Sequence, residues 1–294
     1  MLPDLILRSL FTIVPVLPPS ALAALARVTA RIEFLASSGR RRAVVSNLKQ
    51  IARSGHGSVA RPREVHRIAR SIFDSYHRFL VEYFGQEALD AEALDGRFRF
   101  RGMELVYRAL AEGRGAVVCA PHLGNWELAA IALSKIGYRV HVVTGVQFRK
   151  SWTGSIRAMK ARQQILLSTP DEGYAPLLAT LRGGGMVALL TDGDVYVRSL
   201  NTRFFGRAIP FPAGPAILAR RARTPILHAH AEREPDGSHI LSFDGVEHAD
   251  PALPLEADLH RLTRRVAEAQ ERAVAAHLDQ WCIFRPLFAH SDAA

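Results

Sequence analysis

The sequence predicts an α/β protein with a mixed, mostly parallel sheet that is flanked by helices. Short buried apolar runs, typical of strands, alternate with segments whose apolar residues recur at three- and four-residue intervals, as in helices. This order favours parallel pairing, because the chain must cross back over the sheet between parallel strands. With 294 residues and 48% hydrophobic content, the chain can bury a substantial core.

The N-terminal part of the chain predicts two short apolar helices, at residues 5–17 and 21–35, which carry Arg8, Arg27 and Arg31. No run of 18 uncharged apolar residues occurs, so a membrane-spanning helix is not expected. Two prolines follow the first stretch without a small-residue cleavage site, which disfavours a signal peptide. Two interpretations stay open: the helices lie in a lipid headgroup layer, or they pack on the domain as ordinary core helices.

Two more helices and an edge strand are expected before the core. The polar segments 37–42 and 53–63 enclose a short helix. Apolar residues between positions 64 and 84 follow helical spacing, and Gly85 is expected to end this long helix. Arginine and phenylalanine alternate strictly over residues 97–101, which predicts an edge strand.

The chain divides into an N-terminal helical, membrane-associating region at residues 1–95 and an α/β core at residues 96–294. In the core we expect strands at residues 116–120, 138–144, 165–168, 186–190, 226–231 and 239–243. We expect helices at residues 103–112, 126–136, 152–164, 175–181, 213–222 and 255–278. No internal repeat or low-complexity linker interrupts this order.

The charge of the chain indicates a polyanionic partner. The net charge is +10, and 34 of the 38 basic residues are arginine, whose planar fork binds phosphate and carboxylate. Nucleic acid, an anionic membrane surface or an acidic carrier protein would each satisfy this charge. A high arginine content produced by codon bias alone is the remaining alternative.

Cysteines, histidines and glycines offer few other sites. Cys119 and Cys282 can form neither a disulfide framework nor a CxxC metal site, and the chain is expected to be intracellular. Cys119 lies in an apolar strand and is expected to be an inert core thiol. The twelve histidines show no metal-ligand cluster in the sequence, and His228 and His230 alternate on a strand without a third ligand in view. Glycines 183–185 lack the lysine and hydroxyl of a P-loop and predict a turn.

The segment 115–130, GAVVCAPHLGNWELAA, predicts a strand, a turn and a helix. On a continuous helix His122 and Glu127 would lie about 140° apart, so they can meet only if His122 precedes the helix. Asn125 is the expected N-cap, which places Glu127 in the first helical turn. A carboxylate that accepts a hydrogen bond from one imidazole nitrogen leaves the other nitrogen free to take a proton from a hydroxyl.

Blocks along nearly the whole chain resemble the bacterial lipid A biosynthesis acyltransferase family, which includes phosphatidylinositol mannoside acyltransferases. These blocks are RRRAVVSNL (40–48), FLVEYF (79–84), APHLGNWE (120–127), LLTDGD (189–194), TRFFGRAIPFPAGPAILAR (202–220) and DQWCIFRPLF (279–288). The family commonly has Gly soon after an Arg at the position of Arg162, and Asp-Gln where this chain has Asp192-Gly193. These two departures bear most on the identity of the acceptor.

The resemblance implies a glycerolphosphate acyltransferase-like fold and a role for each matched residue. His122 would be the general base, Glu127 its partner and Asn125 the residue that shapes the turn and the substrate site. Contacts with substrate are implied for Arg162, Asp192, Phe205, Gly206 and Gly214. Each of these five residues has an ordinary structural alternative, such as a solvated helix position, a turn or core packing.

The function implied is transfer of a fatty acyl chain from acyl carrier protein or acyl coenzyme A to a hydroxyl of a membrane glycolipid or lysophospholipid. No metal and no resident cofactor is expected, because the acyl thioester is a co-substrate. The protein would be peripheral, on the cytoplasmic face of the inner (plasma) membrane, and would bind no nucleic acid. The alternatives are a thioesterase or lipid hydrolase with the same His122 and Glu127, and a non-enzymatic binder of anionic lipid or nucleic acid.

Overall fold

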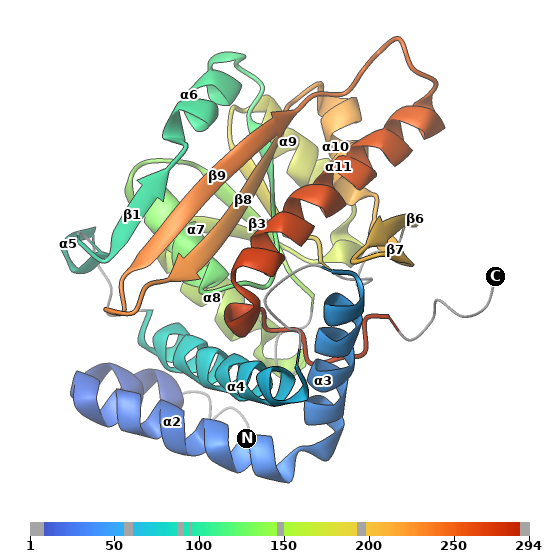
Figure 1. Cartoon of the computed structure of the whole chain (residues 1–294). Helices are drawn as coiled ribbons and strands as arrows, with labels where there is room; N and C mark the ends of the chain where they lie inside the picture. The colour runs from blue at the N-terminus through green and yellow to red at the C-terminus, as the bar shows by residue number, and fades with distance from the viewer. Residues whose placement is uncertain are drawn as a thin grey trace.

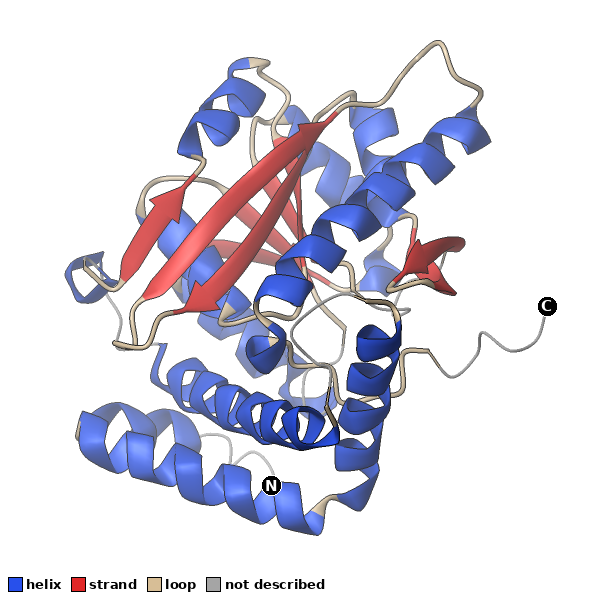
Figure 2. Ribbon diagram, in the orientation of Figure 1, coloured by secondary structure: helices blue, strands red, loops and turns tan. Residues whose placement is uncertain are grey.

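The computed structural model describes residues 9–55, 61–86, 91–94, 96–145, 150–192 and 198–288. These residues form a central sheet with helices on both faces and a group of helices below it (Figures 1 and 2). The predicted α/β class with a mostly parallel sheet is confirmed.

The seven-stranded sheet has the order β1-β9-β8-β2-β5-β3-β4. Its strands are β1 (Phe98–Arg101), β2 (Ala116–Ala120), β3 (Val140–Val143), β4 (Ile165–Ser168), β5 (Met186–Leu190), β8 (Ile226–Arg233) and β9 (His239–Glu247). The pairing of β8 with β9 is antiparallel and the other pairings are parallel. β1 lies at the edge, as its alternating sequence predicts.

Two layers of helices enclose the sheet. α6 (Met103–Ala111) and α7 (Trp126–Lys135) share one apolar core with one face of the sheet. α9 (Ala175–Arg182), α10 (Gly214–Ala222) and α11 (Leu255–Ala276) share another core on the opposite face. α8 (Thr153–Arg162) packs near the β4 edge. Short helices are α5 (Ala91–Leu94), η3 (Lys150–Trp152), η4 (Pro170–Glu172) and η5 (Leu278–Gln280).

A hairpin of β6 (Ser199–Phe204) and β7 (Arg207–Pro212) is an element that the sequence analysis missed. Its two-residue turn is Phe205-Gly206, with φ of 48° and 75°. Two successive positive φ angles are typical of the tight turns that match strand twist, but Phe is an unusual residue at the first position. Because Phe205 stands at the first turn position, the sequence did not indicate a hairpin here.

The N-terminal helices are η1 (Val14–Val16), α2 (Pro19–Ala36), α3 (Ser38–Arg53) and α4 (Pro62–Gly85). The predicted break at residues 37–42 is limited to Ser37, because α2 ends at Ala36 and α3 begins at Ser38. Part of the predicted helix at residues 5–17 lies outside the described residues. In the described part of the chain, no helix combines the length and the apolar character needed to cross a membrane.

Candidate active site

An apolar cavity of about 500 Å³ lies between the sheet and α7. Its walls come from both predicted regions of the chain, because α4 contributes Tyr76, Phe79 and Tyr83 beside the strands of the core. Small side chains leave the space open where strands face α7: Ala120, Ala129, Ala130, Ala188, Ala229 and Ala231 all line the cavity. Its size lies within the usual range for pockets that hold small ligands.

His122 lines this cavity from the loop that follows β2. Asp192 occupies the matching place after β5. Ala120 and Leu190 are partners in the parallel register of these strands, and each of the two functional residues lies two positions further along the chain. Carboxyl ends of neighbouring parallel strands meet at one edge of a sheet, which is where α/β proteins usually place their sites.

Asp192 fixes both the backbone and the ring of His122. Its Oδ1 lies 2.7 Å from His122 Nδ1, and its Oδ2 accepts hydrogen bonds of 2.8 Å from the backbone N–H of His122 and from Trp281 Nε1. Burial raises the pKa of Asp192, but the His122 ring and these hydrogen bonds outweigh burial and hold its pKa below the usual range. Asp192 is therefore a buried carboxylate that favours the tautomer of His122 with the proton on Nδ1.

Glu127 also lines the cavity, and its carboxylate contacts Lys160, a residue that the sequence did not indicate as its partner. Its Oε2 forms a buried ion pair with Lys160 Nζ, and Lys160 also donates a hydrogen bond of 3.3 Å to Gln86. The carboxylate at His122 Nδ1 is that of Asp192. The sequence did not indicate Asp192 as the partner of Nδ1, and the role of Glu127 as a partner of His122 stays a prediction.

The turn between β2 and α7 has the predicted geometry. Asn125 Oδ1 caps α7 by accepting a hydrogen bond of 3.0 Å from the N–H of Leu128, which confirms the predicted N-cap. Asn125 Nδ2 donates a hydrogen bond to Glu82 of α4. Gly124 has a φ of +62°, and a Cβ at this position would lie 2.2 Å from the carbonyl oxygen of Ala231, so only glycine fits.

Glu82 joins this turn to the end of β8. It accepts hydrogen bonds from Asn125 and from both Nε and Nη2 of Arg233, and it lies 3.5 Å from His239. Burial raises the pKa of Glu82, but Arg233 and His239 together lower it to about 2.

The chain after α11 holds the loop that carries His122 from the other side. The N–H of Cys282 donates a hydrogen bond of 2.8 Å to the carbonyl of His122, and the N–H of Gly124 donates to the carbonyl of Gln280. Trp281 reaches Asp192 as described above, and Leu123 forms a bridge with Trp281. Three residues distant in sequence therefore fix the loop that carries His122.

The other residues predicted to contact substrate have structural surroundings of their own. Phe205 and Gly206 form the β6–β7 turn, Gly214 begins α10 and Arg162 is exposed at the end of α8. The described residues that line the cavity include none of Asn125, Arg162, Asp192, Phe205, Gly206 and Gly214. Their contacts with substrate stay predictions.

Asp192, Lys160 and Trp281 are the partners whose roles the sequence analysis missed. For Asp192 a signal existed: it stands two residues beyond a buried strand, as His122 does. Lys160 and Trp281 gave no such signal, because their contacts depend on how α8 and the C-terminal segment fold back on the site.

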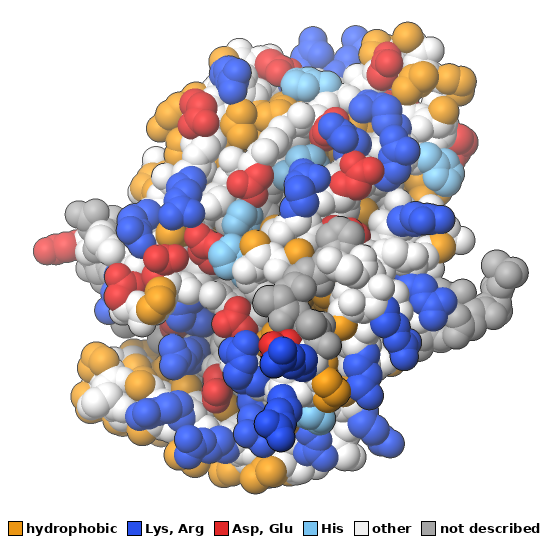
Figure 3. Space-filling view, in the orientation of Figure 1, with side chains coloured by type: hydrophobic (Ala, Val, Ile, Leu, Met, Phe, Trp, Pro, Cys, Tyr) orange, Lys and Arg blue, Asp and Glu red, His pale blue; other side chains and the backbone are white. Residues whose placement is uncertain are grey.

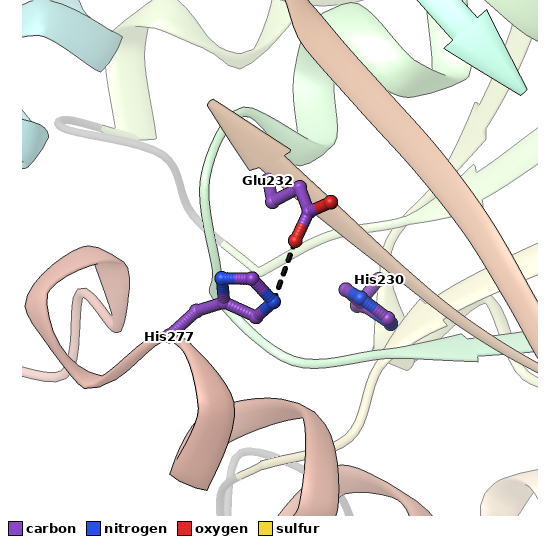
Figure 4. Close-up of side chains that lie close together, drawn as sticks. All are labelled: His230, Glu232 and His277. Atoms are coloured by element: carbon purple, nitrogen blue, oxygen red, sulfur yellow. Dashed lines mark ion pairs between the residues drawn. The ribbon is translucent and has the colours of Figure 1, made fainter. Parts of the chain in front are cut away.

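One group of side chains among the described residues corrects the expectation that the histidines form no metal-ligand cluster. His230 and Glu232 on β8 and His277 after α11 offer ligand atoms that all lie within 4.8 Å of one another. Figure 4 shows the three side chains pointing toward one another, with His277 paired to Glu232. The sequence hid this group because His277 joins it only after α11 packs beside β8.

The fold and the site together define an α/β enzyme with an apolar cavity that is lined by a histidine, and this histidine is paired with a buried aspartate. The family described as bacterial lipid A biosynthesis acyltransferase matches residues 5–290, so the chain belongs to this family and is an acyltransferase. A phosphatidylinositol mannoside acyltransferase of Mycolicibacterium smegmatis (strain ATCC 700084 / mc(2)155) is 24% identical over 74% of this chain and 71% of its own. The protein of the same name from Mycobacterium tuberculosis (strain CDC 1551 / Oshkosh) is 26% identical, over 72% and 67%.

Proposed function

We propose that the chain transfers a fatty acyl group from an acyl thioester to a hydroxyl of a membrane glycolipid or lysophospholipid. The observation that carries the proposal is the apolar cavity lined by His122, whose Nδ1 is hydrogen-bonded to Asp192. The cavity suits an apolar tail, and the pair suits removal of a proton from a hydroxyl. The related acyltransferases are named for phosphatidylinositol mannoside, so a mannosylated phospholipid is the first acceptor to assay.

His122 carries the proton in the proposed reaction. With Nδ1–H donated to Asp192, Nε2 takes the proton of the acceptor hydroxyl while the hydroxyl oxygen attacks the thioester carbonyl. The tetrahedral intermediate then collapses, the carbon–sulfur bond breaks, and the His122 imidazolium returns its proton to the leaving thiolate. The first backbone N–H groups of α7 offer partial positive charge for the oxyanion.

Glu127 is proposed as a second residue of the site rather than as the orienting partner at Nδ1. It lines the cavity near His122 in the first turn of α7, and Lys160 offsets its charge. His122 is partly buried, and the negative charge of the Glu127 carboxylate beside it would help to stabilise the imidazolium that forms during the reaction. Asn125 keeps the proposed role of shaping the turn at the substrate site. Contact with substrate stays the proposed role of Arg162, Asp192, Phe205, Gly206 and Gly214.

The N-terminal helices are proposed to hold the protein on the surface of an anionic membrane. Residues 19–85 contain twelve basic and four acidic side chains, so they carry eight of the ten net positive charges. Figure 3 shows Lys and Arg side chains over α2, α3 and α4. The same charge would attract an acidic acyl carrier protein or the phosphates of acyl coenzyme A. A peripheral position on the cytoplasmic face of the inner membrane follows from this proposal.

Transfer of a labelled acyl group by the purified protein tests the function. With a labelled acyl thioester and a mannosylated phospholipid in mixed vesicles, we expect labelled acceptor to form, and His122→Ala to reduce the rate by at least about a hundredfold. His66→Ala, which removes an exposed histidine of α4, is the matched control and should leave the rate unchanged. Equal rates for His122→Ala and the unaltered protein would overturn the mechanism.

Product analysis separates the two alternatives from transfer. Free fatty acid that accumulates while acceptor is present would indicate a thioesterase or lipid hydrolase. Retention of anionic lipid without formation of any acylated product or free fatty acid would indicate a binding protein.

A further inference from the structure

We propose that His230, Glu232 and His277 bind a divalent transition-metal ion, with Zn²⁺ as the reference ion. Their three ligand atoms lie within 4.8 Å of one another, and they come from the middle of a strand and the end of a long helix (Figure 4). Two imidazoles and one carboxylate are a ligand set that zinc sites use, with a further position left for water.

The geometry needs only a small adjustment to hold the ion. Tetrahedral zinc with bonds of about 2.0–2.1 Å separates its ligand atoms by roughly 3.3 Å. His277 Nε2 and Glu232 Oε2 are 2.5 Å apart, so they must open by about 1 Å, and the third atom must approach from within 4.8 Å. His277 lies between the last residue of α11 and the first residue of η5, so its side chain can shift without being inside either helix.

The surroundings supply the second set of contacts that metal sites require. Asp244 Oδ2 lies 2.7 Å from His230 Nδ1. This nitrogen is buried, and the two groups are not aligned for a hydrogen bond. A carboxylate beside one nitrogen of a ligating histidine orients the ring and makes the other nitrogen a better ligand. Arg101 holds Glu232 Oε1 at 3.2 Å, which leaves Oε2 for the ion.

The charges near this group also favour a cation. Glu232 and Asp244 are two carboxylates, and the carboxylate of Glu232 is buried. The cationic side chains that face them are Arg101, which is mostly exposed, and Arg272, which acts on Asp244. Neutral imidazoles add no charge, so a divalent ion would offset the buried negative charge of the group.

The proposed site lies on the back of the same strand that forms the cavity wall. Ala229 and Ala231 of β8 line the cavity, whereas the alternating residues His230 and Glu232 face the other side. Immediately after His277, Gln280, Trp281 and Cys282 contact Gly124, Asp192 and His122. A bound ion would therefore fix the end of α11 to β8 and hold the segment that supports the catalytic loop.

Metal titration of the purified full chain, with any affinity tag removed and chelator dialysed away, tests the site. We expect one equivalent of Zn²⁺ to bind by calorimetry, and Zn²⁺ at about a hundred times its Kd to raise the Tm by about 5 °C. Co²⁺ is expected to bind with a visible absorption spectrum typical of imidazole ligands, which Zn²⁺ then abolishes by displacement.

Two variants and a matched control assign the binding to these residues. His277→Ala and Glu232→Gln should lose the equivalent and the rise in Tm, each measured against its own metal-free protein. His248→Ala removes a histidine that is also paired with a glutamate, Glu112, but is exposed, and it should keep both. Absence of binding by the unaltered chain, or equal binding by the three variants, would overturn the proposal. If a variant fails to fold, the Co²⁺ spectrum of the unaltered chain still tests the proposal, because a spectrum without imidazole ligands would overturn it.

Discussion

The arrangement at His122 depends on a single buried carboxylate that serves two purposes. One oxygen of Asp192 contacts the ring nitrogen Nδ1, and the other holds the backbone of the same residue and the indole of Trp281. An aspartate in this position orients the ring of His122 and also fixes the loop that carries it. Sequence spacing directed attention to Glu127, five residues from His122, because local pairs are visible in a sequence and distant pairs are not.

Asp192→Asn is expected to lower kcat by about 10²–10⁴-fold and to change KM little. The amide oxygen can still accept the hydrogen bonds from the backbone N–H of His122 and from the indole N–H of Trp281. The amide no longer stabilises the imidazolium, however, and it can favour the wrong tautomer. Steady-state kinetics of acyl transfer measure the effect, with circular dichroism to check the fold. Asp236→Asn, at an exposed turn, is the control. A kcat within a factor of three of the unaltered enzyme would show that Asp192 does not orient the base.

At the scale of elements, α4, α7 and β8 meet at Glu82. This side chain of α4 accepts hydrogen bonds from the N-cap of α7 and from Arg233 at the end of β8. The contact joins the helical N-terminal part to the core at the turn that carries His122. Its strength depends on pH, because the carboxylate must be ionised to hold Arg233.

The contribution of Glu82 to stability is expected to disappear in acid. Its folded pKa of about 2 lies below the ordinary value of 4.5, so the contribution is complete above about pH 5 and is lost as the pH falls toward 2. Chemical denaturation should show that Glu82→Gln lowers the free energy of unfolding by roughly 3 kcal/mol at pH 7, and that this difference shrinks on acidification. Glu104→Gln, exposed on α6, should show no such dependence. A difference that stays constant from pH 7 to pH 2.5 would contradict the assignment.

At the scale of the whole molecule, the core could be predicted where local patterns decide structure. β2 and β5 have their predicted bounds, because continuous apolar runs between turn residues leave few alternatives. The β6–β7 hairpin could not be predicted, since its turn contains Phe205 at a positive φ. Contacts such as Trp281 with Asp192 and His277 with Glu232 join residues 89 and 45 positions apart, and only the folded topology brings them together.

The exposed face of α2 supports the proposal that this helix lies in a lipid headgroup layer. Ala26 and Ala30 are buried, whereas Leu25, Val28, Ile32 and Leu35 are 40–74% exposed. At about 100° per residue these four side chains fall within roughly 80° of the helix surface, opposite the buried alanines. An ordinary core helix would not expose such a stripe, but a helix in a headgroup layer would bury it in lipid.

The double variant Ile32→Glu with Leu35→Glu is therefore expected to bind vesicles that contain phosphatidylglycerol at least about tenfold more weakly. Each side chain would forfeit its transfer into the headgroup layer, and each glutamate would be repelled by anionic lipid. Vesicle sedimentation measures the binding, and transfer to a detergent-dispersed acceptor should be unchanged because neither residue lines the cavity. Ile136→Glu, which alters an exposed apolar residue after α7, should bind vesicles as the unaltered protein does. Unchanged binding by the double variant would mean that the arginines alone hold the protein on the membrane, and binding should then vanish at high salt.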